Sequence, residues 1–475
     1  MTLINRLTKN KMKNVIAYLL LLVVLIFSSC KEDEPEAEVF EPDTNEYVNN
    51  WIFDNMDLYY YWTDELPDKN INGQSPDDYF YSLISTSDRF SWIQPNFREL
   101  LNSLQGITLE AGYEFILYRD AETENGVIGQ IAYIKKGSPA DNVDLKRGDL
   151  FTAVNGTSLT LDNFNDQLGN INSNHTLSVQ RYNFNSETFE EIGDIELNAI
   201  QFAENPNHLD TVYTRNGKKI GYYIYNLFAT GTDANSGAYS MEMDQIFQGF
   251  KSEGIDHLVL DLRYNSGGAE TATINLASLI GSNISDQDIF VKRDYNDGLK
   301  QALIDRNGEE SLNKKFVNKA ENIGNDLQSP QLTVLTSSRT ASASELLING
   351  LDPFMDIFII GDTTLGKNVG STSFFEEDNP DNNWGMQPII TKSFNSLNQS
   401  DYDLGFYPDI PLLDNSLLKL ELGDVNEKLL REALIYLAGT DEVSRSTRFR
   451  EIPARDLGGS LEMKRRFGIY DIDLN

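Results

Sequence analysis

The chain has 475 residues, and 39 Lys and Arg against 73 Asp and Glu give it a formal net charge of −34. This acidic balance argues against nucleic acid as a partner, because phosphates need a basic face. A single cysteine excludes an intrachain disulfide framework and a Cys-rich metal centre, and three histidines leave little for a His-based metal centre. A chain of this length is expected to form two to four domains. Its composition predicts neither a metal site nor a nucleic-acid partner.

Residues 1–29 have the features of a secretory signal peptide. Four basic residues in the first 14 positions precede the apolar run Val15–Phe27, which is shorter than the roughly 20 residues that span a bilayer. Two serines then precede Cys30, and this arrangement resembles a bacterial lipobox, in which the cysteine is lipidated. The resemblance implies export and an acyl anchor in outer-membrane lipid of a Gram-negative envelope, facing the periplasm or the cell surface. A plain signal peptide with an incidental cysteine is the alternative.

Two short regions follow the predicted signal. Residues 30–44 are acidic and read as a solvated tether. Residues 45–104 predict a small helical domain, because apolar and aromatic side chains recur at three- and four-residue steps from Tyr47 to Trp62. We interpret these aromatic residues as a core stripe.

Residues 105–197 change to short strand-like runs separated by turns. The turn sequences GSPA, LKRGD and VNG follow one another in this segment, and the ordered set resembles a PDZ domain. A PDZ domain binds a peptide's C-terminal carboxylate on backbone N–H groups while the peptide adds a strand to the sheet. The resemblance implies that this carboxylate-binding loop contains Gly112, Tyr113, Glu114 and Phe115.

Residues 198–440 alternate strand-like and helical patterns, which predicts a layered α/β domain. The strand-like runs lie at 219–225, 257–262, 332–335 and 357–360. The helical patterns lie at roughly 237–253, 270–281, 342–351 and 424–438. Segments 283–330 and 372–404 are polar with few pattern cues, so they are candidates for a lid or a partner surface, and residues 441–475 form a C-terminal extension.

Three motifs in the α/β region are candidates for chemistry: DLRYNSGG at 261–268, SSRTASASE at 337–345 and GDTTLGK at 361–367. The third is a P-loop as far as its lysine. Asn368 stands where a P-loop needs Ser or Thr and the start of a helix. We therefore expect no nucleotide.

In this order the motifs resemble the C-terminal processing peptidases, which are tail-specific serine proteases with a Ser–Lys dyad. In that family the nucleophile is the first serine of an S-A-S-E sequence and the lysine follows 25 residues later, positions that Ser342 and Lys367 hold here. The resemblance implies a crotonase-like layered α/β core with an inserted or preceding PDZ domain. It also implies an endopeptidase that needs no cofactor, captures substrates with exposed C-termini and cleaves them.

The chemistry of the residues supports the same pair. A serine hydroxyl needs an adjacent base, neither serine motif has a neighbouring histidine, and a lysine can serve when burial lowers its pKa. Ser342 would open a helix, so the N–H of Ala343 is available to an oxyanion. The second oxyanion donor would be Gly267 or Gly268, and the sequence does not choose between them.

Other residues near the pair are expected to support it. Glu345 would complete a capping box or orient the site, and Asp261 with Arg263 would hold the end of a strand. Ser371 stands where many relatives have a glutamine that orients the lysine, so its hydroxyl is a candidate for that task. Two other functions stay open: a catalytically silent PDZ-type envelope scaffold lipoprotein, and an esterase or amidase that acts on small molecules.

Overall fold

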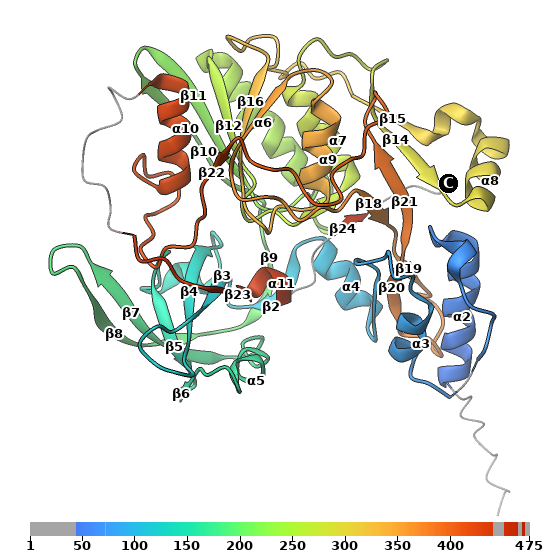
Figure 1. The fold of residues 1–475 in the computed structure, drawn as a ribbon, viewed down its shortest axis with the longest axis horizontal. Helices are drawn as coiled ribbons and strands as arrows, with labels where there is room; N and C mark the ends of the chain where they lie inside the picture. The colour runs from blue at the N-terminus through green and yellow to red at the C-terminus, as the bar shows by residue number, and fades with distance from the viewer. Residues whose placement is uncertain (1–43, 72, 440–450, 464–467, 471–475) are drawn as a thin grey trace, which may run out of the picture. The chain divides into compact units, whose positions relative to one another are not determined.

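A computed structural model of the chain describes residues 44–71, 73–439, 451–463 and 468–470. The predicted signal peptide, Cys30 and nearly all of the acidic tether lie outside these residues. No helix within the described ranges is both long and apolar enough to cross a membrane. The chain from Asn45 onward clusters into one unit (Figure 1).

A six-stranded sheet lies at the centre of this unit, in the order β10–β11–β12–β16–β17–β22. The first two strands form an antiparallel hairpin, and the remaining neighbours run parallel. The four strands predicted for the α/β domain are confirmed as β11, β12, β16 and β17. The strand bounds are β10 Asn207–Arg215, β11 Lys218–Tyr225, β12 His257–Asp261, β16 Gln331–Thr336, β17 Asp356–Gly361 and β22 Ile410–Pro411.

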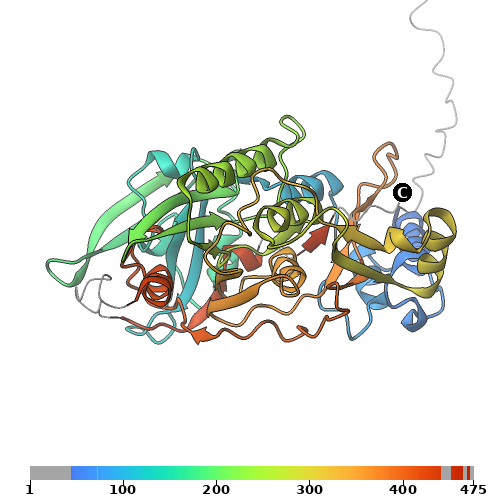
Figure 2. The same cartoon turned by 90° about the horizontal axis from the view of Figure 1, so that it is seen from above.

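Helices cover both faces of this sheet, and Figure 2 shows α6 and α10 on opposite sides of it. Successive strand residues point to opposite faces: Tyr223 joins a core with Leu276 of α7, whereas Tyr222 joins a core with Leu430 of α10. Burial on both faces explains why the strands read as continuous apolar runs. All four predicted helices are confirmed: α6 Ala238–Glu253, α7 Glu270–Ile280, α9 Ala343–Leu351 and α10 Lys428–Ala438.

The segment with the PDZ-like turns forms a second sheet, ordered β23–β3–β4–β5–β7–β8, with β6 paired to β5. The predicted Asn-Gly turn is confirmed, since Asn155 and Gly156 have φ values of 51° and 75°. The outer strand β23 comes from the C-terminal extension. The bounds are β3 Tyr113–Arg119, β4 Val127–Ile134, β5 Leu150–Val154, β6 Thr157–Ser158, α5 Phe164–Leu168, β7 His175–Asn183, β8 Thr188–Leu197 and β23 Asp456–Gly459.

The N-terminal helices pack on their own apolar core. Ile52 and Met56 are fully buried there with Phe80, and strand residue Met386 from far along the chain joins them. The predicted core stripe is confirmed for Tyr60 and Trp62, which belong to the same cluster, but not for Tyr47, which is 40% exposed. The elements are α2 Thr44–Tyr59, α3 Pro76–Leu83, β1 Trp92–Gln94, α4 Phe97–Leu104, β2 Ile107–Glu110 and β9 Ile200–Ala203.

The two segments with few pattern cues contain regular structure that their sequences did not indicate. They pair with each other in a four-stranded sheet, β15–β14–β21–β18, in which Tyr295 lies opposite Thr391. Pairing across such a separation leaves no local periodicity to read. The elements are β14 Ile289–Tyr295, α8 Asp297–Asn307, β15 Asn313–Lys315, β18 Val369–Ser371, β19 Phe374–Phe375, β20 Gly385–Gln387 and β21 Ile389–Phe394.

Candidate active site

Ser342 lies between the turn that follows β16 and the first residue of α9. Its φ is +58°, in the left-handed region that a residue with a Cβ rarely adopts. The side chain is fully buried, and its Oγ has no hydrogen-bond partner within the described residues. Backbone strain and an unused buried hydroxyl are both typical of a functional residue.

Lys367 lies in the loop between β17 and β18, and its side chain is fully buried. Burial lowers the pKa of its ammonium from the ordinary 10.5 to about 7, although the carboxylates of Asp88 and Glu345 oppose the shift. The Nζ atom lies 5.0 Å from the centre of the Phe90 ring. A lysine with a pKa near 7 can lose its proton at neutral pH and act as a base.

Glu345 holds the backbones of both residues. Its Oε2 accepts the N–H groups of Ser342 and Lys367, each at 2.8 Å, and its Oε1 accepts the Gly366 N–H at 2.7 Å and the Thr364 hydroxyl at 2.5 Å. Burial raises the pKa of this carboxyl, although the four hydrogen bonds act in the opposite direction. One carboxylate therefore brings together two segments that are 25 residues apart.

The predicted glycine pair forms the short strand β13, Gly267–Ala269. The Gly267 N–H donates to Asn265 Oδ1 at 2.9 Å, and the Asn265 carbonyl accepts the Ala341 N–H at 3.2 Å. A Cβ on Gly268 would lie 2.2 Å from the Phe228 carbonyl oxygen, so only glycine fits there. Asn265 therefore ties the glycine pair to the turn that carries Ser342.

The loop of Lys367 is also held by a segment from the N-terminal helical region, which the sequence did not predict. Arg89 donates to the Gly366 carbonyl at 2.6 Å and to the Asp403 carbonyl at 3.0 Å. Its neighbour Asp88 is one of the carboxylates that raise the pKa of Lys367, and its neighbour Phe90 has its ring 5.0 Å from the Lys367 Nζ atom. No local pattern could reveal this contact, because the segments lie 277 residues apart.

Ser371 donates a hydrogen bond from its Oγ to Gln387 Oε1 at 2.6 Å, and both side chains are buried. A glutamine side chain thus lies beside the position after Lys367 where the sequence has serine, but it comes from strand β20. Local sequence does not reveal Gln387, because it lies on strand β20, 16 residues after Ser371.

A buried ionic network supports the end of β12, as predicted. The Arg263 guanidinium donates to Asp261 Oδ2 at 2.8 Å and to Glu427 Oε1 at 2.6 Å. All three side chains are buried. Such paired charges fix geometry, and removing one partner would leave an uncompensated buried charge.

Residues 112–115, predicted to form a carboxylate-binding loop, are buried throughout, and residues 113–115 form the start of strand β3 rather than a loop. Glu114 contributes a carboxylate to it, and the Lys135 ammonium lies 2.8 Å from that carboxylate. The Phe115 N–H donates to the hydroxyl of Ser460, a residue of the C-terminal extension, at 2.9 Å. The carboxylate-binding role of Gly112, Tyr113, Glu114 and Phe115 stays a prediction.

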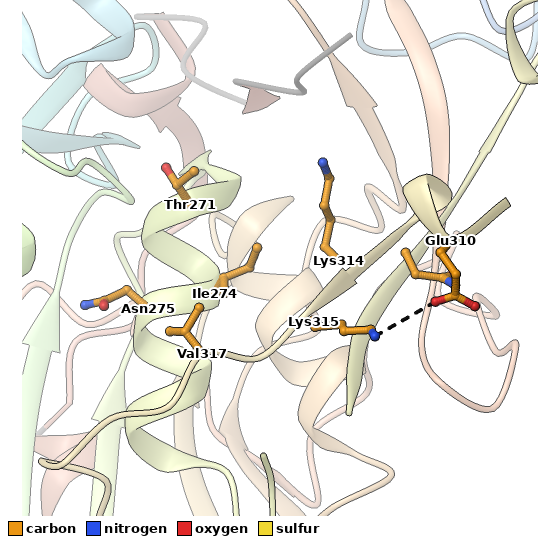
Figure 3. Close-up of a pocket in the computed structure, with 8 residues that line it drawn as sticks. Thr271, Ile274, Asn275, Glu310, Lys314, Lys315 and Val317 are labelled. Carbon is orange, nitrogen blue, oxygen red and sulfur yellow. Dashed lines mark ion pairs between the residues drawn. The ribbon is translucent and has the colours of Figure 1, made fainter. Parts of the chain in front are cut away.

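A cavity of about 580 Å³ lies beside α7, where Thr271 and Ile274 face the strand of Lys315 (Figure 3). Lys315 forms a 3.9 Å ion pair with Glu310 at its rim. Neither residue of the predicted dyad lines this cavity.

Among the residues with described positions, no group of three or more His, Cys, Asp or Glu side chains is placed to hold a metal ion.

Two family descriptions match the chain. "Peptidase S41 N-terminal domain" matches residues 47–92, which include Asp88 and Phe90, and "Peptidase family S41" matches residues 219–412, which include Ser342 and Lys367. The chain belongs to peptidase family S41. The α/β core predicted for this S41 family member is confirmed, while its crotonase-like and PDZ-like descriptions stay predictions.

Similar proteins agree with this assignment. A carboxyl-terminal-processing protease from Picosynechococcus sp. is 25% identical over 277 residues, which are 58% of this chain and 58% of that protein. A CtpA-like serine protease from Staphylococcus aureus is 26% identical over 242 residues, which are 50% of this chain and 41% of that protein. The S41 family member thus spans about half the length of these curated relatives. A solved S41 protease structure from Bacteroides fragilis matches with a TM-score of 0.67 and 26% identity, covering 82% of this chain and 98% of that one.

Proposed function

We propose that this S41 family member is an exported serine endopeptidase, with Ser342 as the nucleophile and Lys367 as the general base. One observation carries the proposal: the fully buried Lys367 has a pKa of about 7, and its backbone shares a Glu345 oxygen with the backbone of Ser342. A serine nucleophile needs a base that can take its proton, and a lysine with a pKa near 7 is partly unprotonated at neutral pH.

In the proposed reaction, Ser342 Oγ attacks the scissile carbonyl carbon while its proton passes to Lys367 Nζ. The tetrahedral intermediate then collapses, the C–N bond breaks, and the Lys367 ammonium returns the proton to the leaving amine. Water attacks the resulting ester, and Lys367 accepts the proton of that water. The second tetrahedral intermediate collapses, the bond between its carbon and Ser342 Oγ breaks, and the Lys367 ammonium returns its proton to Oγ. The acid is released with Ser342 as a hydroxyl and Lys367 as an amine, so only water is consumed.

The oxyanion of the intermediate would be held by two backbone N–H groups. Ala343 is the first residue of α9, where backbone N–H groups lack partners within the helix. Of the glycine pair, Gly267 already donates to Asn265. Gly268 is paired with Ile469 of the C-terminal extension, so the second donor is proposed to be Gly267 or Gly268.

The test compares cleavage of fluorescently labelled casein, a loosely folded substrate, by the wild type, Ser342→Ala and Lys367→Ala. Both variants should lose activity by a factor of about 10³ or more. Ser338→Ala is the matched control, because Ser338 lies in the same turn with its side chain exposed, and it should keep wild-type activity. Equal cleavage by the wild type and both dyad variants would refute the proposal.

The sheet around β3 is proposed to act as the PDZ-like part, which receives an extended stretch of a substrate's tail as an added strand. The alternative, a catalytically silent envelope scaffold, would use the same strand edge. Casein cleavage separates the two, since a scaffold would bind tails equally well with Ser342→Ala and would yield no product from the wild type.

Anchoring through Cys30 is part of the proposal and rests on the sequence of residues 1–30. Expression of the wild type and Cys30→Ser in a Gram-negative host, followed by fractionation, tests it. The wild type should be found in the outer-membrane fraction and label with radioactive palmitate, whereas Cys30→Ser should do neither. Equal palmitate labelling of both would refute the anchor.

A further inference from the structure

A segment of the C-terminal extension already occupies the edge of β3. Strand β23 pairs with it antiparallel, with Asp456 opposite Tyr118 and Gly459 opposite Ile116 (Figure 1). A Cβ on Gly459 would lie 2.3 Å from the Phe115 carbonyl oxygen. The close approach therefore requires a glycine at this place in the bound strand.

The residue after β23 binds the loop that was expected to hold a carboxylate. Ser460 Oγ accepts the Phe115 N–H at 2.9 Å and donates to the Glu114 carboxylate. Three carboxylates surround the Lys135 ammonium there, with Glu110 at 2.7 Å and both Glu114 and Glu204 at 2.8 Å. This excess of negative charge disfavours a free carboxylate ligand and favours a hydroxyl that can donate.

Side chains on either side of Ser460 are recognised as well. Arg339, three residues before Ser342, forms ion pairs with Asp456 at 2.9 Å and with Glu462 at 2.8 Å. Leu461 is buried in a cluster with Ile116 and Tyr118. The contacts are therefore specific for an acidic residue at 456, a glycine at 459, a hydroxyl at 460, an apolar residue at 461 and a second acidic residue at 462.

The same extension then reaches the glycine pair of the candidate active site. After α11, Ser460–Met463, strand β24, Gly468–Tyr470, pairs parallel with β13. Gly468 lies opposite Gly267, and Ile469 lies opposite Gly268. The backbone of the extension therefore lies both on the β3 edge proposed to receive substrate and on the glycine pair of the candidate active site.

From these contacts we infer that residues 455–462 are a tethered peptide ligand of the β3 edge and compete in cis with substrate. The edge binds an internal, extended stretch of acidic-x-Gly-Gly-Ser-Leu-acidic character, without using a terminal carboxylate. The effect on activity rests on the proposed peptidase function, whereas binding at the edge does not.

The binding test uses Ser342→Ala protein, so that no cleavage occurs, and a fluorescent peptide of residues 455–463, RDLGGSLEM. Adding Gly459→Val to the protein should displace the tether, because the new side chain meets the β3 backbone. That protein should bind the peptide at least tenfold more tightly than Ser342→Ala alone, and a C-terminal amide should not weaken binding. No gain in affinity, or loss of binding on amidation, would overturn the inference.

A second variant combines Asp456→Lys with Glu462→Lys and breaks both ion pairs to Arg339. Because these two side chains are partly exposed, the variant should fold even if Gly459→Val does not. Met463→Ala is the matched control, since Met463 is 41% exposed and lies outside the proposed ligand. In the Ser342→Ala background, the charge variant should bind the peptide several-fold more tightly than Ser342→Ala alone. With Ser342 intact, it should cleave casein several-fold faster than wild type. The Met463→Ala control should change neither measurement.

Unchanged peptide binding and casein cleavage in the charge variant would overturn the inference. Tighter peptide binding without casein cleavage by any protein, wild type included, would support the ligand assignment and refute the peptidase proposal. The two proposals therefore fail in different measurements.

Discussion

Replacing Lys367 by methionine should stabilise the protein while it abolishes activity. Methionine fills a similar volume without an ionisable group. In the unfolded chain a lysine keeps its proton up to pH 10.5, whereas in the folded protein burial lowers the pKa of Lys367 to about 7. Folding at neutral pH must therefore remove much of this charge, and that cost disappears in the variant.

The size of the effect follows from the pKa. The difference between 10.5 and about 7 corresponds to on the order of 5 kcal/mol, since each pKa unit is worth about 1.4 kcal/mol. Between pH 7 and pH 10.5 the unfolded chain binds one more proton than the folded protein, so stability rises with pH in this window. From pH 7 to pH 9 the lysine protein should gain about 2 kcal/mol relative to the methionine variant.

The assay is urea unfolding from pH 6 to pH 9 in a Ser342→Ala background, which prevents self-cleavage. The Lys367→Met protein should be the more stable at pH 7, and its advantage should shrink steadily as the pH rises. Lys392→Met on β21 is the matched control, because it removes a lysine whose side chain is 27% exposed. A stability difference between lysine and Lys367→Met that stays constant from pH 7 to pH 9 would refute the reasoning.

Three further substitutions test the surroundings of the pair. Glu345→Gln should lower the kcat for casein about 100-fold and the free energy of unfolding by about 2 kcal/mol, because an NH2 group replaces one carboxylate oxygen and cannot accept hydrogen bonds; wild-type kinetics would contradict this. Phe90→Ala should admit water to Lys367, raise its pKa and move the midpoint of the pH–rate profile upward by about one unit; an unmoved midpoint would argue against shielding by the ring. Glu427→Gln should destabilise the protein by about 3 kcal/mol in urea, because the buried Arg263 loses a charged partner, yet leave the pH–rate midpoint in place; a shifted midpoint would show that the network also tunes the site.

Local sequence patterns predicted the parts of the fold that depend on local physics. The β11 and β12 strands and the α6 and α9 helices follow from apolar runs and from three- to four-residue periodicity. The turn that presents Ser342 and the loop that holds Lys367 were located by motif and spacing.

Contacts between distant segments could not be predicted in this way. Phe90, whose ring lies beside the Lys367 ammonium, comes from the N-terminal region of the chain. Gln387, which accepts a hydrogen bond from Ser371, comes from strand β20. Glu345 was expected at the start of a helix, but its second set of hydrogen bonds, to the loop of Lys367, needed the tertiary structure. The pairing of β23 with β3 is equally remote, because its short Gly-Gly sequence has no strand periodicity.

The most direct test of the central claim is the pH dependence of Ser342 labelling by a fluorophosphonate probe. The account predicts one modified residue, Ser342, with a labelling rate that rises with pH about a midpoint near 7, the pKa of Lys367. Lys367→Ala should lose this midpoint and about 10³-fold of the rate. Labelling of a different residue, or the same midpoint and rate in Lys367→Ala, would contradict the account.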